Sequence, residues 1–242
     1  MIADNILQVR HNIADACART NRNPADVTLI AVSKTHPAEI ILEAVAAGVQ
    51  HFGENRVEEA QIKIPAVNAQ SPVPLTWHMI GHIQSRKAKD VLPLFDRVHS
   101  LDSLKLAGKF SSLALEGDKK LDVLLEVNVS GEESKDGFQA SDWTASQGVR
   151  AALWDEIGQI LKLPGLTVRG LMTMAPIAPD AEQVRPVFAS LAALRAALAE
   201  TFRIELSDLS MGMTDDYPVA IEEGATLVRV GRAIFGEREM RA

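Results

Sequence analysis

Short apolar segments alternate with amphipathic helical patterns along nearly the whole chain. The first of these apolar segments covers residues 27–32, where aliphatic and β-branched residues predict a fully buried strand. A helix signal follows at once, with Pro37 as its first residue, Glu39 in its first turn and Gly48 at its end. This alternation is typical of parallel strands joined by covering helices.

Seven further segments show a strand pattern, and nearly all of them are followed by a helix signal. They cover residues 49–53, 75–81, 96–101, 121–129, 166–174, 206–211 and 226–231. An amphipathic helix is predicted before the first strand, over residues 2–19. Eight such units in 242 residues predict an α/β fold with one domain over residues 1–242, a (β/α)8 TIM barrel with an extra N-terminal helix. The alternative is a doubly wound open sheet, which normally uses fewer strands at this length.

Prolines and a polar loop set the expected limits of three helices. The helix that starts near Val57 should end at about Ile64, because a proline-rich stretch begins at Pro65. A long helical region is predicted after Gly137, to about residue 163. Pro186 lies inside a helical stripe, so that helix should begin late or bend there.

The most informative polar residue follows the first strand. Lys34 lies where a buried parallel strand opens into a loop, and α/β proteins place their chemistry in such loops. Desolvation lowers the pKa of a lysine, and a partly neutral amine can form a Schiff base with a carbonyl group. The alternative is that Lys34 swings outward and is solvated, and the local pattern leaves both open.

Two further polar positions lie late on the fifth strand. Glu126 and Asn128 alternate with valines and therefore share one face of this strand near its carboxyl end. They predict either a polar site at the barrel mouth or a hydrogen-bonded pair in the barrel interior.

The last two strands end in residues suited to an anion. Ser210 can offer a hydroxyl, and Gly231 with Arg232 can offer backbone amides and a guanidinium. Late strands of TIM barrels commonly hold a phosphate in this way. Arg229 lies on the final strand, next to the strand of Lys34 once the barrel closes. A phosphate site that flanks a lysine is stronger evidence than either feature alone.

Composition and motifs exclude several functions. The net charge of −7 argues against nucleic-acid and membrane-surface partners, and Cys17, the single cysteine, excludes an intrachain disulfide and a multi-cysteine metal site. There is no signal peptide or membrane span, so a cytoplasmic location is expected. No P-loop or dinucleotide fingerprint occurs, and His78 with His82 straddles a strand end without a third metal ligand.

Several blocks resemble the pyridoxal phosphate homeostasis proteins over nearly the whole chain. They are Ala31–Lys34, His51–Asn55, Trp77–Gly81, Gln84–Lys87, Val98–Asp102, Gly170–Met174, Leu209–Asp216, Val228–Gly231 and Ile234–Gly236. The resemblance implies a single barrel of the alanine racemase N-terminal type that binds pyridoxal 5'-phosphate as a lysine Schiff base.

By position, the resemblance assigns a role to each candidate site residue. Lys34 is the Schiff-base lysine, Asn55 lies on the cofactor side, and Ser210, Gly231 and Arg232 hold the phosphate. Arg229 is the cofactor-contacting arginine, toward either the phosphate or the pyridine nitrogen. An arginine at the nitrogen would weaken the electron sink that strong amino-acid chemistry needs.

The chain departs from the family pattern at three positions. His82 stands where proline is usual, Arg86 where asparagine is usual, and Arg232 where a small hydroxyl residue is usual. The last change puts the side-chain part of that phosphate contact in doubt, although the backbone amide would still serve.

The resemblance implies a carrier rather than an enzyme. Racemases of this fold take a second acid/base, a tyrosine, from a C-terminal β domain across a dimer, whereas this sequence has Tyr217 alone. We therefore expect a monomer without catalytic residues that maintains intracellular pyridoxal phosphate (vitamin B6) and indirectly affects amino-acid and keto-acid balance. Apoenzymes that use this cofactor are the partners such a carrier would serve. The alternatives are a pyridoxal-phosphate-dependent amino-acid racemase and a cofactor-free Schiff-base aldolase.

Overall fold

Eight parallel strands form a closed barrel in the computed structural model, which describes residues 1–237. The strands follow one another around the sheet as β4-β3-β2-β1-β9-β8-β7-β5, and pairing of β4 with β5 closes it. Their bounds are β1 Thr28–Val32, β2 His51–Glu54, β3 Thr76–Met79, β4 Arg97–Leu101, β5 Leu121–Asn128, β7 Leu166–Met172, β8 Asp208–Ser210 and β9 Leu227–Val230. The predicted TIM barrel is confirmed.

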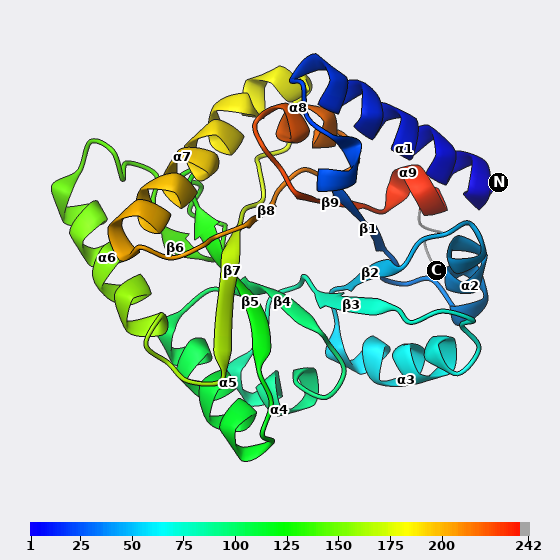
Figure 1. Cartoon of the computed structure of the whole chain (residues 1–242), viewed down its shortest axis with the longest axis horizontal. Coiled ribbons are helices and arrows are strands. Elements are labelled where there is room, and N and C mark those ends of the chain that lie inside the picture. Colours follow the sequence, from blue (N-terminus) through cyan, green and yellow to red (C-terminus); the bar gives the residue numbers. More distant parts are fainter. Residues whose placement is uncertain (238–242) are drawn as a thin grey trace.

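Helices surround the barrel (Figure 1). Their bounds are α1 Ile2–Arg19, α2 Ala38–Ala46, α3 Val57–Asn68, α4 Ala88–Val91, α5 Leu104–Glu116, α6 Gln147–Ile160, α7 Arg185–Phe202, α8 Tyr217–Glu222 and α9 Arg232–Phe235. Short 3₁₀ helices cover Pro24–Asp26, Ser85–Lys87 and Ala181–Val184. The expected N-terminal helix has the predicted bounds. Within residues 1–237, no helix combines the length and apolar character needed to cross a membrane.

Two predicted helix limits are wrong, and a third is confirmed. Helix α3 continues through Pro65, because Ile64 and Val67 both pack into the core on either side of it. The helix near Pro186 begins late, as predicted: residues Ala181–Val184 form a 3₁₀ helix, and α7 starts at Arg185. Pro186 lies in the first turn of α7, where its missing amide hydrogen removes no helical hydrogen bond.

The long helix expected after Gly137 is also wrong in its first part. Residues Phe138–Gln139 form a short strand, β6, which pairs with the end of β5 outside the barrel ring. Helix α6 begins only at Gln147, where the hydroxyl of Ser146 accepts a hydrogen bond from the amide of Val149. The cap therefore decides the start of this helix. Pro37, expected inside α2, is its N-cap residue.

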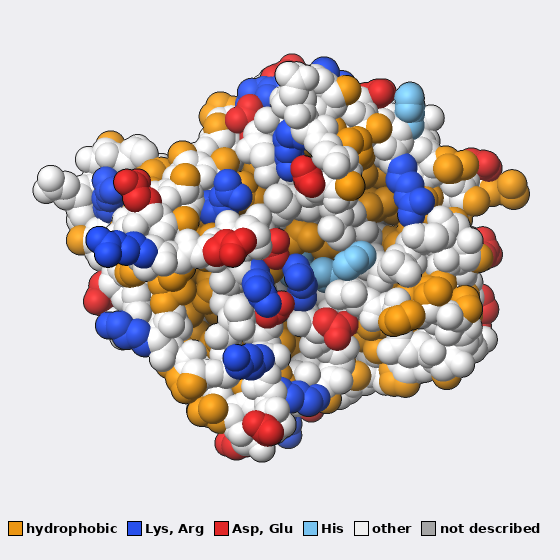
Figure 2. All heavy atoms as spheres, viewed as in Figure 1, with side chains coloured by type: hydrophobic (Ala, Val, Ile, Leu, Met, Phe, Trp, Pro, Cys, Tyr) orange, Lys and Arg blue, Asp and Glu red, His pale blue; other side chains and the backbone are white. Residues whose placement is uncertain are grey.

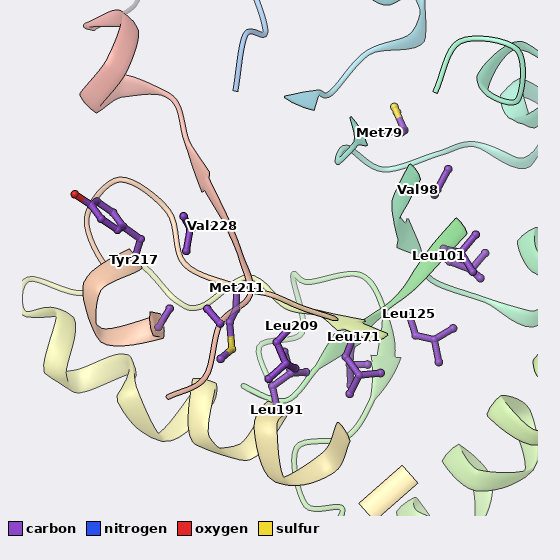
Figure 3. Close-up of a cluster of buried hydrophobic side chains, with 14 of the residues drawn as sticks. Met79, Val98, Leu101, Leu125, Leu171, Leu191, Leu209, Met211, Tyr217 and Val228 are labelled. Atoms are coloured by element: carbon purple, nitrogen blue, oxygen red, sulfur yellow. The ribbon is translucent and has the colours of Figure 1, made fainter. Parts of the chain in front are cut away.

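The apolar core lies mainly between the barrel wall and the helices. Figure 3 shows Leu171 and Leu209 of the barrel wall beside Leu191 of α7, and all three are fully buried. A separate, small apolar cluster lies inside the barrel and consists of Ile30, Leu124, Met172 and Leu227. Much of the remaining interior is polar, and this part carries the candidate site.

Helix α1 joins the two ends of the barrel sequence. The amide of Asn5 donates to the carbonyl of Ile234, and that of Asn12 donates to the hydroxyl of Tyr217, each at 2.8 Å. Beneath the helix, β1 pairs with β9 so that Ile30 lies opposite Arg229. We call this β1–β9 junction the seam.

Two glycines offer a paired test of the barrel. A Cβ on Gly170 of β7 would lie 1.8 Å from the carbonyl oxygen of Asp208 on β8, whereas a Cβ on Gly108 of α5 would meet nothing within 4 Å. Gly170→Ala should therefore lower the free energy of unfolding by about 1–3 kcal/mol. Gly108→Ala should raise it by about 0.5–1 kcal/mol, because alanine favours helix. Urea unfolding measures both, and equal midpoints would contradict the close strand contact.

Candidate functional site

Lys34 lies at the carboxyl end of β1, half-buried in the turn that leads to α2. Thr35, the next residue, has a left-handed backbone with φ of 69°. The ring of His36 then packs against Phe235 of α9, with ring centroids 4.8 Å apart. The turn that carries Lys34 therefore lies against the chain that follows β9.

Gly231 lies on the other side of the seam. A Cβ at this position would come within 3.3 Å of both the Cβ and the carbonyl oxygen of Val32, so the backbone at Gly231 approaches β1 closely. Gly231 also begins α9, and its carbonyl accepts hydrogen bonds from the amides of Ile234 and Phe235. Gly231 therefore lies against the end of β1, two residues before Lys34.

Arg229 is buried at the centre of the site. Its Nη1 donates to both the carbonyl and the hydroxyl of Ser210, at 2.8 and 2.5 Å, and its Nη2 donates to the carbonyl of Thr173 at 2.9 Å. Burial lowers the pKa of Arg229 to about 10, against the opposing effect of Glu126 and Asp216. The guanidinium therefore stays charged at neutral pH, and within residues 1–237 no carboxylate forms an ion pair with it.

Ser210 is fully buried at the end of β8, and its hydroxyl contacts Arg229 and His99. Arg232 differs, since its side chain is half exposed and Nη2 lies 2.7 Å from Oδ1 of Asp215. Its guanidinium is thus turned toward a surface carboxylate. The assignment of Ser210, Gly231 and Arg232 to a phosphate stays a prediction.

Asn55 follows β2 and presents an acceptor into the site. Its Oδ1 is buried and has no hydrogen-bond partner within the described chain. Because an unpaired buried acceptor is costly, this atom fits a ligand that donates a hydrogen bond. The predicted place of Asn55 on the ligand side is consistent with this unpaired atom.

A buried ion pair beside β1 was missed by the sequence reasoning. The Oε1 atom of Glu54 accepts hydrogen bonds from the Ser33 hydroxyl at 2.7 Å and from Lys63 Nζ at 2.9 Å. Lys63 also donates to the carbonyl of Ser33, the residue before Lys34. Burial raises the pKa of Glu54, against Lys63, and its Oε2 has no partner within residues 1–237. The available signal was a glutamate that ends a strand next to Asn55.

Glu126 forms the opposite side of the interior. It is 4% exposed, and burial raises its pKa to about 7, assisted by Asp102 and Asp136 and opposed by Arg229. Asn128 instead holds the loop after β5, since its side chain donates to the carbonyl of Glu132 at 2.8 Å. The two polar residues predicted on β5 therefore have different roles: Glu126 is a titratable group near Arg229, and Asn128 holds the loop after β5.

Three histidines continue the polar interior below Ser210. His99 Nδ1 lies 2.8 Å from Ser210 Oγ, His78 Nδ1 lies 2.8 Å from His99 Nε2, and His51 Nδ1 lies 3.1 Å from His78 Nε2. His82 points elsewhere, toward Asp102 and Asp136. His78 and His82, weighed as a metal pair from their spacing, therefore have separate partners.

Comparison with known proteins places this chain in a family. The model for the alanine racemase N-terminal domain matches residues 5–239. The chain belongs to this family. Its curated relatives are named pyridoxal phosphate homeostasis proteins, which confirms the resemblance found in the sequence. The relative from Pseudomonas aeruginosa is 43% identical over 100% of this chain and 97% of its own length. The Aquifex aeolicus protein is 39% identical over 98% of both chains.

Solved structures of similar proteins share the fold. PipY of Synechococcus elongatus with PLP bound superposes with a TM-score of 0.82 and 36% identity, over 98% of this chain and 100% of that one. An alanine racemase from Clostridium difficile has a TM-score of 0.69 at 16% identity, over 97% of this chain and 57% of that one. The latter similarity shows the common barrel alone.

The carboxyl of Glu126 predicts a measurable pH effect. With a pKa of about 7 in the folded chain and about 4.3 when unfolded, the folded state binds more protons between these values. The free energy of unfolding should therefore fall as pH rises from about 4 to about 7, by roughly 2–4 kcal/mol from this group. In Glu126→Gln the side chain does not titrate, so this part of the fall in the free energy of unfolding should be absent. Urea unfolding at several pH values should show the two curves diverging with rising pH, and parallel curves would contradict the burial of a titrating carboxyl.

Proposed function

We propose that this chain binds pyridoxal 5'-phosphate at the barrel mouth through Lys34 and maintains the intracellular supply of this cofactor. The observation that supports the proposal is the seam itself: the end of β1, which leads into Lys34, lies against Gly231, and Arg229 is buried on the neighbouring strand. An amine, a buried cation and a closely packed backbone suit an aldehyde that bears a phosphate. Relatives named for this function, and PipY with PLP bound, support it.

The residues of the site fit the cofactor. Lys34 would supply the amine for covalent attachment, and the backbone amides at Gly231 and Arg232 would hold the phosphate. Asn55 Oδ1, unpaired within the described chain, suits a hydroxyl donor, and Arg229 brings a charge toward the phosphate or the pyridine nitrogen. When bound, pyridoxal phosphate supplies an aldehyde that amines can trap and, with a protonated ring nitrogen, an electron sink.

We propose a carrier rather than an enzyme because the residues present do not complete an acid/base pair for racemisation. Tyr217 is buried beneath α1, and its hydroxyl accepts from Asn12. It therefore cannot serve as the second proton donor at the mouth. An arginine at the ring nitrogen would also disfavour the protonated ring that racemisation uses.

Glu126 is the one observation that favours the racemase alternative. A buried carboxyl with a pKa of about 7 has the properties of a general acid/base at neutral pH. Its position near Arg229 is compatible with a proton-transfer role. We therefore treat turnover as a direct test.

The wider role belongs to the same proposal. The chain would act in the cytoplasm as a monomer and release the cofactor to apoenzymes that use it, with indirect effects on amino-acid and keto-acid balance. Sizing of the loaded protein by light scattering tests the monomer.

Attachment can be tested by colour and by mass. With pyridoxal phosphate added, the protein should turn yellow, and borohydride should fix the cofactor on Lys34 in a peptide map. Lys34→Ala should lose both the colour and the adduct, because no other amine is expected to replace it. Lys109→Ala, an exposed lysine on α5, is the matched control and should keep both. A colourless protein that takes up no cofactor would leave the aldolase alternative.

Catalysis can be tested on the loaded protein. We expect no racemisation of alanine or other amino acids at ordinary enzyme rates of about 1–1,000 per second. Chiral chromatography after long incubation measures this directly. Turnover in that range, abolished by Glu126→Gln, would replace the carrier by the racemase and assign Glu126 as its acid/base.

A further inference from the structure

A continuous chain of side chains crosses the barrel interior from the site to the opposite end. It runs from Arg229 through Ser210, His99 and His78 to His51, on five different strands. His78 and His99 are fully buried, whereas His51 is half-buried. We call the three histidines the relay.

The relay is electrically neutral. Burial holds the pKa of His78 and of His99 well below the usual range, and neighbouring Arg97 acts in the same direction on both. Burial and Arg97 also lower the pKa of His51, against Asp96. A neutral imidazole has one donor and one acceptor nitrogen. Each ring can therefore donate to only one of its two neighbours, so the three rings must point the same way.

Ser210 determines that direction in the structure. Its hydroxyl oxygen accepts from Arg229 Nη1, and His99 Nδ1 is the acceptor within reach of its hydrogen among the described residues. A buried hydroxyl without an acceptor is costly, so Ser210 donates to His99. His99 then carries its proton on Nε2 and donates to His78, which in turn donates from Nε2 to His51.

The opposite direction becomes favourable when Ser210 donates to something else. If a ligand anion accepts the hydroxyl hydrogen, His99 must protonate Nδ1 to keep its contact with Ser210. His78 and His51 must then protonate Nδ1 as well, because each ring now donates toward the mouth. Each imidazole loses one N–H and gains the other: the proton that leaves His51 Nε2 passes to solvent at the far end, and His99 Nδ1 takes one from solvent at the mouth. The charge of the relay is therefore unchanged.

The far end of the relay can accommodate either direction. His51 lines a cavity of about 420 Å³ together with Arg10, Gln50 and residues of β1. Figure 2 shows pale-blue histidine atoms inside a hollow near the middle of the molecule, beside charged side chains. Solvent in such a cavity can accept a hydrogen bond from the protonated Nε2 of His51 or donate one to its deprotonated Nε2.

We propose that His51, His78 and His99 are positioning residues for Ser210: a neutral relay that reverses as one unit when a phosphate-bearing ligand takes the Ser210 hydroxyl. This inference rests on the proposed binding of pyridoxal phosphate. Ligand binding at the barrel mouth would thereby decide whether His51 Nε2 donates or accepts a hydrogen bond in the cavity at the other end of the barrel. By reciprocity, a hydrogen-bond donor in that cavity should favour the loaded state.

Nitrogen NMR of protein labelled with ¹⁵N-histidine tests the proposal, because the protonated ring nitrogen is identified directly. Without cofactor, His51, His78 and His99 should all be neutral with the proton on Nε2. After loading, verified by visible absorbance, all three should carry it on Nδ1. His11, exposed on α1, is an internal reference that should not change.

Two serine variants separate a relay from general loosening. Ser210→Ala removes the hydroxyl, so loading should no longer reverse the rings. Ser100→Ala removes another buried hydroxyl, which donates to the carbonyl of Gly81 outside the relay, and should leave the reversal intact. Rings that keep their tautomers in the loaded wild-type chain, or that change singly, would overturn the relay and leave the carrier proposal standing. Absence of cofactor absorbance would overturn both.

Discussion

Pairing of β1 with β9 is the constraint on which the site depends. The first and last barrel strands meet in parallel, with Ile30 opposite Arg229. This register brings the turn after β1, which carries Lys34, next to the backbone of Gly231. Neither half of the chain contains the site by itself. A shift of one residue in this pairing would turn Arg229 out of the barrel, because side chains alternate between the two faces of a strand.

Polar groups can be buried inside the barrel because nearly every one has a hydrogen-bond partner or is uncharged. Burial of a guanidinium is costly, and Arg229 offsets the cost through hydrogen bonds to Ser210 and Thr173. The buried histidines avoid the cost by staying uncharged. Within residues 1–237 the exception inside the barrel is Asn55 Oδ1, at the end of β2. Glu54 Oε2 also has no partner there, but Glu54 lies on the outer face of β2, where it bonds Lys63 of α3. Unpaired atoms in an otherwise satisfied interior mark where a ligand is expected.

The barrel was predictable because strand and helix signals are local. Eight apolar segments and the glycine stop at Gly48 lie within a few residues of the elements they define. Pro65 was misjudged because packing of its neighbours outweighed a local penalty, and β6 because two residues are too few to form a pattern. The single domain over residues 1–242 stays a prediction, since residues 238–242 lie outside the described part.

The site was predictable only in part, for the same reason. Lys34 and Gly231 each follow a recognisable strand, so strand order alone places them together. The relay joins β2, β3 and β4, and the hydrogen bond that links His99 to Ser210 of β8 spans 111 positions of sequence. No local pattern reports such a contact. Lys63 was missed because its amine reaches back from α3 to Glu54 and to the Ser33 carbonyl.

The position of α1 has a consequence for how the molecule is made. Helix α1 has partners in α8 and α9, which are synthesised more than 200 positions after it, through Asn12–Tyr217 and Asn5–Ile234. It cannot dock until those elements have been synthesised, and the seam beneath it closes only then. A nascent chain therefore has no competent pocket until α9 has been synthesised, and cofactor can be captured only after that point.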